Sequence, residues 1–252
     1  MGCNYKLKTT NSKLKKVFRF KQFAIDDTGA TMKVGTDAVL LGALAHCAGA
    51  ANILDIGTGC GVVALIMAQR SANAAIHAVE PDTCSADCAR KNFEVSPWSD
   101  RLAVFETTAQ QFARTAERRY DCIVCNPPYF ERSLKSPLEI RNKARHNDNL
   151  PFDELAGCVA RLLANNGTFT AILPCAEAAH FISTAKEKDL FCKSKKLIYS
   201  KLSNNPLRTV FAMGREEYDT PQVSQVAIYN GDGQYSGQYR ELTRDLYLWG
   251  EK

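Results

Sequence analysis

A short apolar run that leads into a glycine-rich turn and then into a second apolar run constrains this chain most strongly. Residues 52–56 have the pattern of a buried β-strand, residues 57–61 form the turn, and residues 62–69 have the pattern of a helix. A strand joined to a helix through glycines begins a βαβ unit, in which the backbone of the turn can approach a ligand closely. The chain is therefore predicted to build a parallel sheet around this turn.

The same alternation of strands and helices continues along the chain. Further strands are predicted at 75–80, 102–107, 120–125 and 168–173, and near 196–202 and 208–214, with helices over 82–92, 152–163 and 176–188. The pattern predicts an α/β, Rossmann-like fold with a seven-stranded, mostly parallel sheet and helices on both faces. Residues 31–252 would form this domain, with an extra C-terminal strand at 222–229 and a short helix near 239–247. Residues 1–30 would form a basic N-terminal appendage.

Composition limits the classes of protein to which the chain can belong. Of its 252 residues, 45% are hydrophobic and 23% are charged, which suits one sizeable core and argues against a disordered chain. No apolar run reaches the roughly 18 residues of a membrane span, and no apolar signal segment follows the N-terminus. We therefore expect a cytoplasmic protein that does not span a membrane, and the sequence indicates no obligate protein partner.

The ten cysteines raise the question of a metal site. Cys122 and Cys125 have a suitable spacing, but they lie in a predicted strand, where residues three apart point to opposite faces. Cys84 and Cys88 fit one face of a helix, but no second pair with zinc-like spacing follows. We expect reduced thiols packed in the core, and no metal site.

Basic residues are concentrated in three stretches of the chain, which has a net charge of +5. Residues 1–25 hold seven lysines and arginines and neither Asp nor Glu, and two further clusters lie at 132–146 and 193–201. Such clusters can bind the phosphate backbone of a nucleic acid. Each cluster by itself is more typical of a solvated surface.

The spacing of the glycines separates two classes of cofactor. A dinucleotide turn has the pattern Gly-x-Gly-x-x-Gly, whereas this turn has Gly57, Gly59 and Gly61, followed by a valine. The spacing resembles the turn of class I methyltransferases, which bind S-adenosylmethionine. Asp55 could then meet the ammonium group of that cofactor, and Glu80, at the end of the next strand, could accept hydrogen bonds from both ribose hydroxyls. The alternative is a tight structural turn with a surface glutamate.

The tetrapeptide Asn126-Pro127-Pro128-Tyr129 follows the fourth predicted strand, at the carboxyl end of the sheet, where open α/β folds bind ligands. The side-chain oxygen of Asn126 and the carbonyl of Pro127 can accept both N–H groups of an exocyclic amino group, which makes its nitrogen a better nucleophile. The prolines stiffen the turn, and Tyr129 can stack on a base. The alternative is a Pro-Pro turn that only ends a strand.

Six segments together closely resemble the bacterial tRNA1(Val) adenine-37 N6-methyltransferase family. They are 20–23, 32–42, 54–61, Ser96-Pro97-Trp98, 126–129 and Ala144-Arg145-His146. The resemblance runs from about residue 18 to the C-terminus. It implies a class I methyltransferase fold, S-adenosylmethionine as methyl donor, tRNA as partner, and methylation of the adenine N6 at position 37 of a valine tRNA.

The resemblance also implies roles for single residues. Cofactor contacts would include Asp55, Gly57, Gly59 and Glu80, and the catalytic element would be residues 126–129. Lys33, Thr36 and Asp37 would line the cofactor or target pocket, although Thr36 and Asp37 could instead be a helix N-cap pair. Many relatives carry an Asp after the third strand that contacts the adenine of the cofactor. Thr108 stands there in this chain, which predicts weaker cofactor binding.

The same tetrapeptide also serves enzymes that methylate other planar nitrogens. The open alternatives are guanine N2 in ribosomal RNA, adenine N6 in DNA and the side-chain amide of a protein glutamine. A further alternative is an inactive RNA-binding module on a methyltransferase scaffold, but the intact glycines, Asp55, Glu80 and Asn126 argue against it. The glycine spacing argues against a dehydrogenase.

Overall fold

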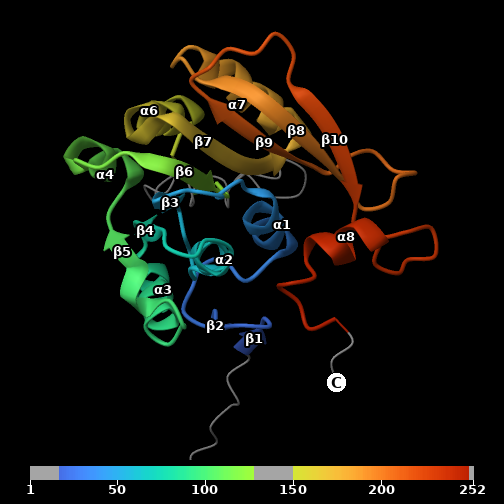
Figure 1. Ribbon diagram of the computed structural model, residues 1–252, viewed down its shortest axis with the longest axis horizontal. Helices are drawn as coiled ribbons and strands as arrows, with labels where there is room; N and C mark the ends of the chain where they lie inside the picture. The colour runs from blue at the N-terminus through green and yellow to red at the C-terminus, as the bar shows by residue number, and fades with distance from the viewer. Residues whose placement is uncertain (1–16, 128–149, 250–252) are drawn as a thin grey trace, which may run out of the picture.

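The computed structural model describes residues 17–127 and 150–249, and its centre is an eight-stranded sheet (Figure 1). The strands are β3 (Asn52–Ile56), β4 (Ala75–Glu80), β5 (Leu102–Glu106), β6 (Tyr120–Cys125), β7 (Leu163–Pro174), β8 (Phe191–Tyr199), β9 (Arg208–Gly214) and β10 (Gln222–Ala227). Their order is β10-β8-β9-β7-β6-β3-β4-β5. Only β9 runs antiparallel to its neighbours among these strands.

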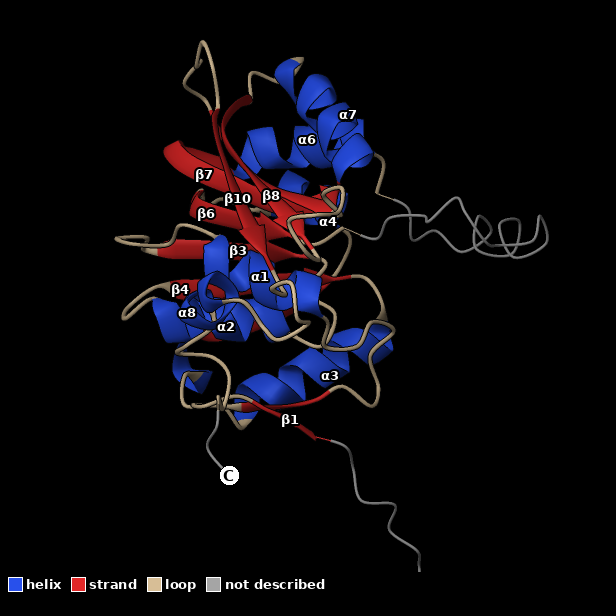
Figure 2. Ribbon diagram, turned by 90° about the vertical axis from the view of Figure 1, so that its right-hand side faces the viewer, coloured by secondary structure: helices blue, strands red, loops and turns tan. Residues whose placement is uncertain are grey.

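Helices cover both faces of the sheet, as predicted (Figures 1 and 2). One face packs against α1 (Thr36–Leu44), α2 (Val62–Arg70), α3 (Thr83–Glu94) and α8 (Gly237–Leu242). The other face packs against α4 (Ala109–Thr115), α6 (Phe152–Leu162) and α7 (Cys175–Lys186). A short 3-10 helix, η1 (Ser99–Arg101), precedes β5. Within the described residues, no helix has both the length and the apolar character to cross a membrane.

The N-terminal residues from 17 onward pack on the rest of the protein. β1 (Val17–Arg19) and β2 (Ala24–Asp26) form an antiparallel hairpin. Phe20 stacks on Tyr247, with ring centroids 5.8 Å apart, and the backbone N–H of Lys21 donates to the carbonyl of Leu246. Phe20, Phe23 and Ile25 belong to the same buried cluster as α1 and α2. The domain division at residue 30 stays a prediction, and residues 17–30 share their core with the residues that follow.

Three features of the sheet differ from the sequence prediction. The extra C-terminal strand joins the sheet as β10, parallel to β8, which makes eight strands instead of seven. β8 begins at Phe191, ahead of the predicted 196. β7 begins at Leu163, ahead of the predicted 168, because Leu163 already pairs with Tyr120. A register shift follows, and a Cβ atom at Gly167 would lie 2.9 Å from the Tyr120 carbonyl oxygen, so this strand needs a glycine there.

The cysteines of β6 lie as predicted. Cys122 packs in the cluster with α1 and α2, whereas Cys125 packs in the cluster with α6 and α7. The two thiols therefore face opposite sides of the sheet, and they cannot bind one metal ion together. All nine cysteines in the described part of the chain are free.

Two helical glycines give a matched test of the packing between α1 and α2. A Cβ atom at Gly42 in α1 would lie 2.9 Å from the Cβ of Ile66 in α2, whereas a Cβ atom at Gly157 in α6 would meet nothing within 4 Å. Gly42→Ala should therefore lower the free energy of unfolding by about 1–3 kcal/mol, because the helices must move apart. Gly157→Ala should raise it by up to about 1 kcal/mol through helix propensity. Urea denaturation measures both, and a stabilising Gly42→Ala would contradict this packing.

Candidate functional site

The glycine-rich turn of residues 57–61 joins β3 to α2 at the carboxyl end of the sheet. Gly57, Gly59 and Gly61 have φ angles of 73°, 57° and 86°, a region that residues with side chains rarely adopt. A Cβ atom would meet nothing within 4 Å at Gly57 or Gly59, but at Gly61 it would lie 2.5 Å from the ring of Phe93. The first two glycines therefore border open space, and the third packs against α3.

Asp55 is buried beneath this turn. Its Oδ2 accepts hydrogen bonds from the Thr58 hydroxyl (2.6 Å) and from the backbone N–H of Ala64 (3.2 Å). Burial raises the pKa of Asp55 to about 7, against the lowering effect of these two hydrogen bonds, and the nearby Glu80 also raises it. Asp55 thus joins the turn to the first residues of α2. Its contact with the cofactor ammonium group stays a prediction.

Glu80 ends β4 next to the turn and is 8% exposed. One carboxylate oxygen accepts from the N–H of Gly59 at 2.8 Å, and the other accepts from the N–H of Asp82 at 3.0 Å. The carboxylate is therefore fixed in position between the turn and the start of α3. A carboxylate fixed in this way is suited to accept hydrogen bonds from ligand hydroxyls, and the ribose contact stays a prediction.

Asn126 and Pro127 follow β6 directly. The Oδ1 atom of Asn126 is buried and accepts no hydrogen bond within the described part of the chain. A buried acceptor without a donor costs about 1–3 kcal/mol, so such an atom in a functional site suggests a ligand donor. Pro128 and Tyr129, the other half of the predicted catalytic tetrapeptide, lie outside the described residues.

Thr108 precedes α4 and acts as its N-cap. Its hydroxyl oxygen accepts a hydrogen bond from the backbone N–H of Gln111 at 3.2 Å. A capping role by itself explains a threonine at this position. The proposed contact between Thr108 and the cofactor adenine therefore stays a prediction.

Thr36 and Asp37 begin α1, but they do not cap it. The N-cap is Gly35, without a side-chain hydrogen bond, so the alternative of an N-cap pair is wrong. Thr36 is exposed, and Asp37 forms a partly buried ion pair with Arg208, with 2.8 Å between Oδ2 and Nε. Arg208 begins β9 opposite Pro174, the last residue of β7. The ion pair therefore links α1 to the carboxyl end of the sheet, and a pocket-lining role for these residues stays a prediction.

The strand register places the central elements side by side. Ile56 lies opposite both Val79 of β4 and Cys125 of β6. The turn, Glu80 and Asn126 consequently begin at the same level on three adjacent strands, which are about 4.8 Å apart. The structure thus brings the turn, Glu80 and Asn126 together at the carboxyl ends of the central strands.

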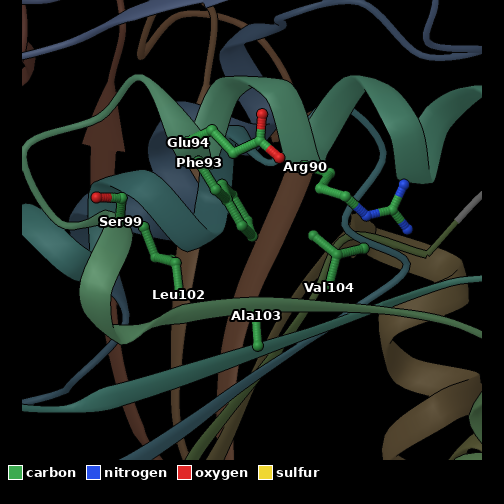
Figure 3. A pocket seen from close by; sticks show the side chains of 7 residues that line it. All are labelled: Arg90, Phe93, Glu94, Ser99, Leu102, Ala103 and Val104. Atoms are coloured by element: carbon green, nitrogen blue, oxygen red, sulfur yellow. The ribbon is translucent and has the colours of Figure 1, made fainter.

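A cavity of about 260 Å³ lies elsewhere, between α3 and β5 (Figure 3). It is lined by Arg90, Phe93, Glu94, Ser99, Leu102, Ala103 and Val104. None of the predicted site residues lines this cavity, and Arg90 is already paired with Asp87 and Glu106. The cavity is therefore separate from the site at the carboxyl end of the strands.

Two residues that contact the predicted site were not identified from the sequence. Arg208 pairs with Asp37 across 171 positions of the chain, a contact that no local pattern indicates. Asn92 of α3 donates to the carbonyl of Cys60 in the turn. The signal for Asn92 in the sequence is a polar residue on the face of the helix that is otherwise made of small or apolar residues.

Comparisons with known proteins find that the chain is similar to methyltransferases. The Methyltransferase small domain family matches residues 30–143. A tRNA1(Val) (adenine(37)-N6)-methyltransferase from Phocaeicola vulgatus is 43% identical over 231 residues, which is 92% of this chain and 97% of the relative. Proteins of the same name from Bacteroides thetaiotaomicron and Photobacterium profundum are 42% and 39% identical, each over 92% of this chain, and 97% and 98% of their own lengths.

Solved structures resemble the chain in fold. A predicted O-methyltransferase from Agrobacterium tumefaciens has a TM-score of 0.63 at 18% identity, over 83% of this chain and 96% of its own. A ribosomal protein L11 methylase from Lactobacillus delbrueckii has a TM-score of 0.53 at 15% identity, over 75% of this chain and 83% of its own. These likenesses show the class I methyltransferase fold.

The buried Asp55 should make stability depend on pH. Its pKa is about 7 in the folded protein and near 3.8 in the unfolded chain, so the folded state binds more protons between these values. This group therefore makes the free energy of unfolding fall as the pH rises through that window. Asparagine can accept the same two hydrogen bonds without titrating. Urea unfolding should show Asp55→Asn gaining up to roughly 3 kcal/mol relative to the wild type from pH 5 to pH 8. An unchanged difference would refute the pKa assignment.

Proposed function

Because the chain belongs to the tRNA1(Val) (adenine(37)-N6)-methyltransferase family, we propose that it transfers a methyl group from S-adenosylmethionine to the N6 of adenine 37 in a valine tRNA. Relatives of that name are 36–43% identical to it. A tRNA substrate also supports a cytoplasmic location. The observation that carries the proposed chemistry is the buried, unpartnered Oδ1 of Asn126, beside the glycine-rich turn.

The residues around the turn fit S-adenosylmethionine. Open space borders Gly57 and Gly59, so a ligand can reach their backbone. The carboxylate of Glu80 is already fixed by the N–H of Gly59 and can accept from ribose hydroxyls. Asp55, beneath the turn, is proposed to meet the cofactor ammonium group. Gly61, Thr36, Asp37 and Thr108 are proposed as further contacts. When bound, the cofactor supplies an electrophilic methyl group on a sulfonium.

Asn126 is proposed to bind and orient the target amino group. The lone pair of an adenine N6 is delocalised into the ring, so the amino group is a poor nucleophile. Its first N–H donates to the unpartnered Oδ1 of Asn126, and its second N–H donates to the Pro127 carbonyl. These two hydrogen bonds favour a tetrahedral nitrogen whose lone pair is free to attack, and the surplus proton leaves after transfer. Tyr129 is proposed to stack on the base.

Substitution of Asn126 tests this role. Asn126→Ala removes the acceptor, so the rate of methyl transfer should fall by a factor of about 100 or more, as when a polar group that acts in the transition state is lost. The affinity for S-adenosylmethionine, measured by calorimetry, should change less than about threefold, since Asn126 contacts the target rather than the turn. Asn126→Asp is the matched control, because it keeps an acceptor oxygen, and it should retain more activity than the alanine variant. Equal losses of transfer and cofactor affinity would show that the residue mainly supports the fold.

The substrate class is tested separately from the catalytic residue. The enzyme is incubated with radiolabelled S-adenosylmethionine and, in separate reactions, with unmodified tRNA, ribosomal RNA, duplex DNA and cell protein. Label in tRNA alone supports the proposal. Label in ribosomal RNA, DNA or protein instead would retain the chemistry at a planar nitrogen and replace the proposed substrate with one of the alternatives.

A further inference from the structure

One face of α3 carries three buried polar side chains. Ser85, Cys88 and Asn92 are three and four positions apart, which places them on the same side of the helix. They are only 0%, 8% and 3% exposed. Buried polar groups need hydrogen-bond partners, so the partners of these three residues indicate what this face is for.

Most of these partners belong to residues 17–31, which we call the N-terminal segment. The hydroxyl oxygen of Ser85 accepts from the backbone N–H of Thr31 at 3.1 Å, and the thiol of Cys88 donates to the carbonyl of Asp26 at 3.0 Å. Asn92 pairs with both backbone groups of Asp26, each at 3.0 Å. The α3 face therefore binds β2 and the loop that follows it.

Asn92 alone also reaches the glycine-rich turn. Its Nδ2 donates to the carbonyl of Cys60 at 2.9 Å, in addition to its bond with the carbonyl of Asp26. Cys60 lies between Gly59 and Gly61, and the ring of the next residue, Phe93, packs against Gly61. A side-chain amide has two N–H groups, and these two carbonyls can use both. One side chain thus joins the N-terminal segment, α3 and the turn.

We propose that Asn92 is a positioning residue for cofactor binding, which holds the Cys60 carbonyl and thereby fixes the conformation of the turn. This inference rests on the proposed use of the turn to bind S-adenosylmethionine. Glycines have many accessible conformations, so a turn that contains three of them needs external restraint. Without the Asn92 bond, the free turn samples other conformations, and the cofactor must reorder it on binding.

The test compares Asn92→Ala with Ser85→Ala in the full chain. Asn92→Ala removes two buried bonds to the backbone of Asp26, and Ser85→Ala removes the buried bond to the backbone of Thr31. Only Asn92→Ala also removes the bond to the turn. The dissociation constant of S-adenosylmethionine is measured by calorimetry without RNA, and thermal unfolding is followed by circular dichroism. Asn92→Ala should bind about fivefold to tenfold more weakly, as expected for one lost hydrogen bond, and Ser85→Ala should stay within about twofold of the wild type.

A second variant covers the case in which Asn92→Ala does not fold. Asn92→Asp has nearly the same size, but its ionised carboxylate cannot donate to the Cys60 carbonyl, so its cofactor affinity should fall at least as much. In steady-state assays of these variants, the KM for S-adenosylmethionine should change more than kcat. Unchanged affinity in both Asn92 variants, or equal weakening in Ser85→Ala, would overturn the positioning role.

The proposed tRNA substrate can fail without affecting this test. Because binding is measured without RNA, absence of methyl transfer to tRNA would leave the comparison between Asn92 and Ser85 intact. Absence of S-adenosylmethionine binding by the wild-type chain would instead overturn the proposed function and, with it, the role of Asn92.

Discussion

Hydrogen bonds from three separate elements hold the turn between β3 and α2, and the rest of the site depends on that turn. Asp55, beneath the turn, accepts from the Thr58 hydroxyl, Glu80 accepts from the N–H of Gly59, and Asn92 donates to the carbonyl of Cys60. The glycines allow the positive φ angles of the turn, but they do not fix its conformation. Side chains of β3, β4 and α3 fix it, together with backbone hydrogen bonds from Gly57 and Thr58 to the carbonyl of Val79. The strands on either side of β3, which are β6 and β4, bring Asn126 and Glu80 to the level of the turn.

At the amino ends of the strands, four of the 32 basic residues have a structural role. Helices that connect parallel strands end near the amino ends of the strands, where the last carbonyls of each helix lack donors within the helix. Guanidinium groups donate to these carbonyls: Arg70 at the end of α1, Arg101 at α2, Arg161 at α4 and Arg215 at α6. This arrangement also suits the negative end of each helix dipole. Part of the net charge of +5 is therefore structural, and it indicates less about nucleic-acid binding than the sequence total implies.

The fold could be predicted where burial leaves a periodic signal. The bounds of β3, β4, β6 and β9 match the prediction because each strand is a short, largely buried run. α1 was not predicted as an element, because six successive residues of its interior are buried and leave no amphipathic period. β8 began earlier than predicted because its first half carries lysines, which are half-buried in the strand instead of solvated in a loop. The glycine spacing, Glu80 and Asn126 could be located from the sequence, since each lies at a strand end. Arg208 and Asn92 could not, because their bonds to Asp37 and Cys60 span 171 and 32 positions and depend on the folded structure.

In the function proposed for this protein, the site at the carboxyl ends of the central strands holds an adenine of tRNA while its exocyclic nitrogen is methylated. The most direct measurement is to methylate unmodified valine tRNA with the purified enzyme and S-adenosylmethionine, digest the product to nucleosides, and map the modified position by mass spectrometry of nuclease fragments. We expect N6-methyladenosine at position 37, beside the anticodon. A methyl group on guanine N2, or valine tRNA that stays unmodified while the enzyme binds its cofactor, would contradict it.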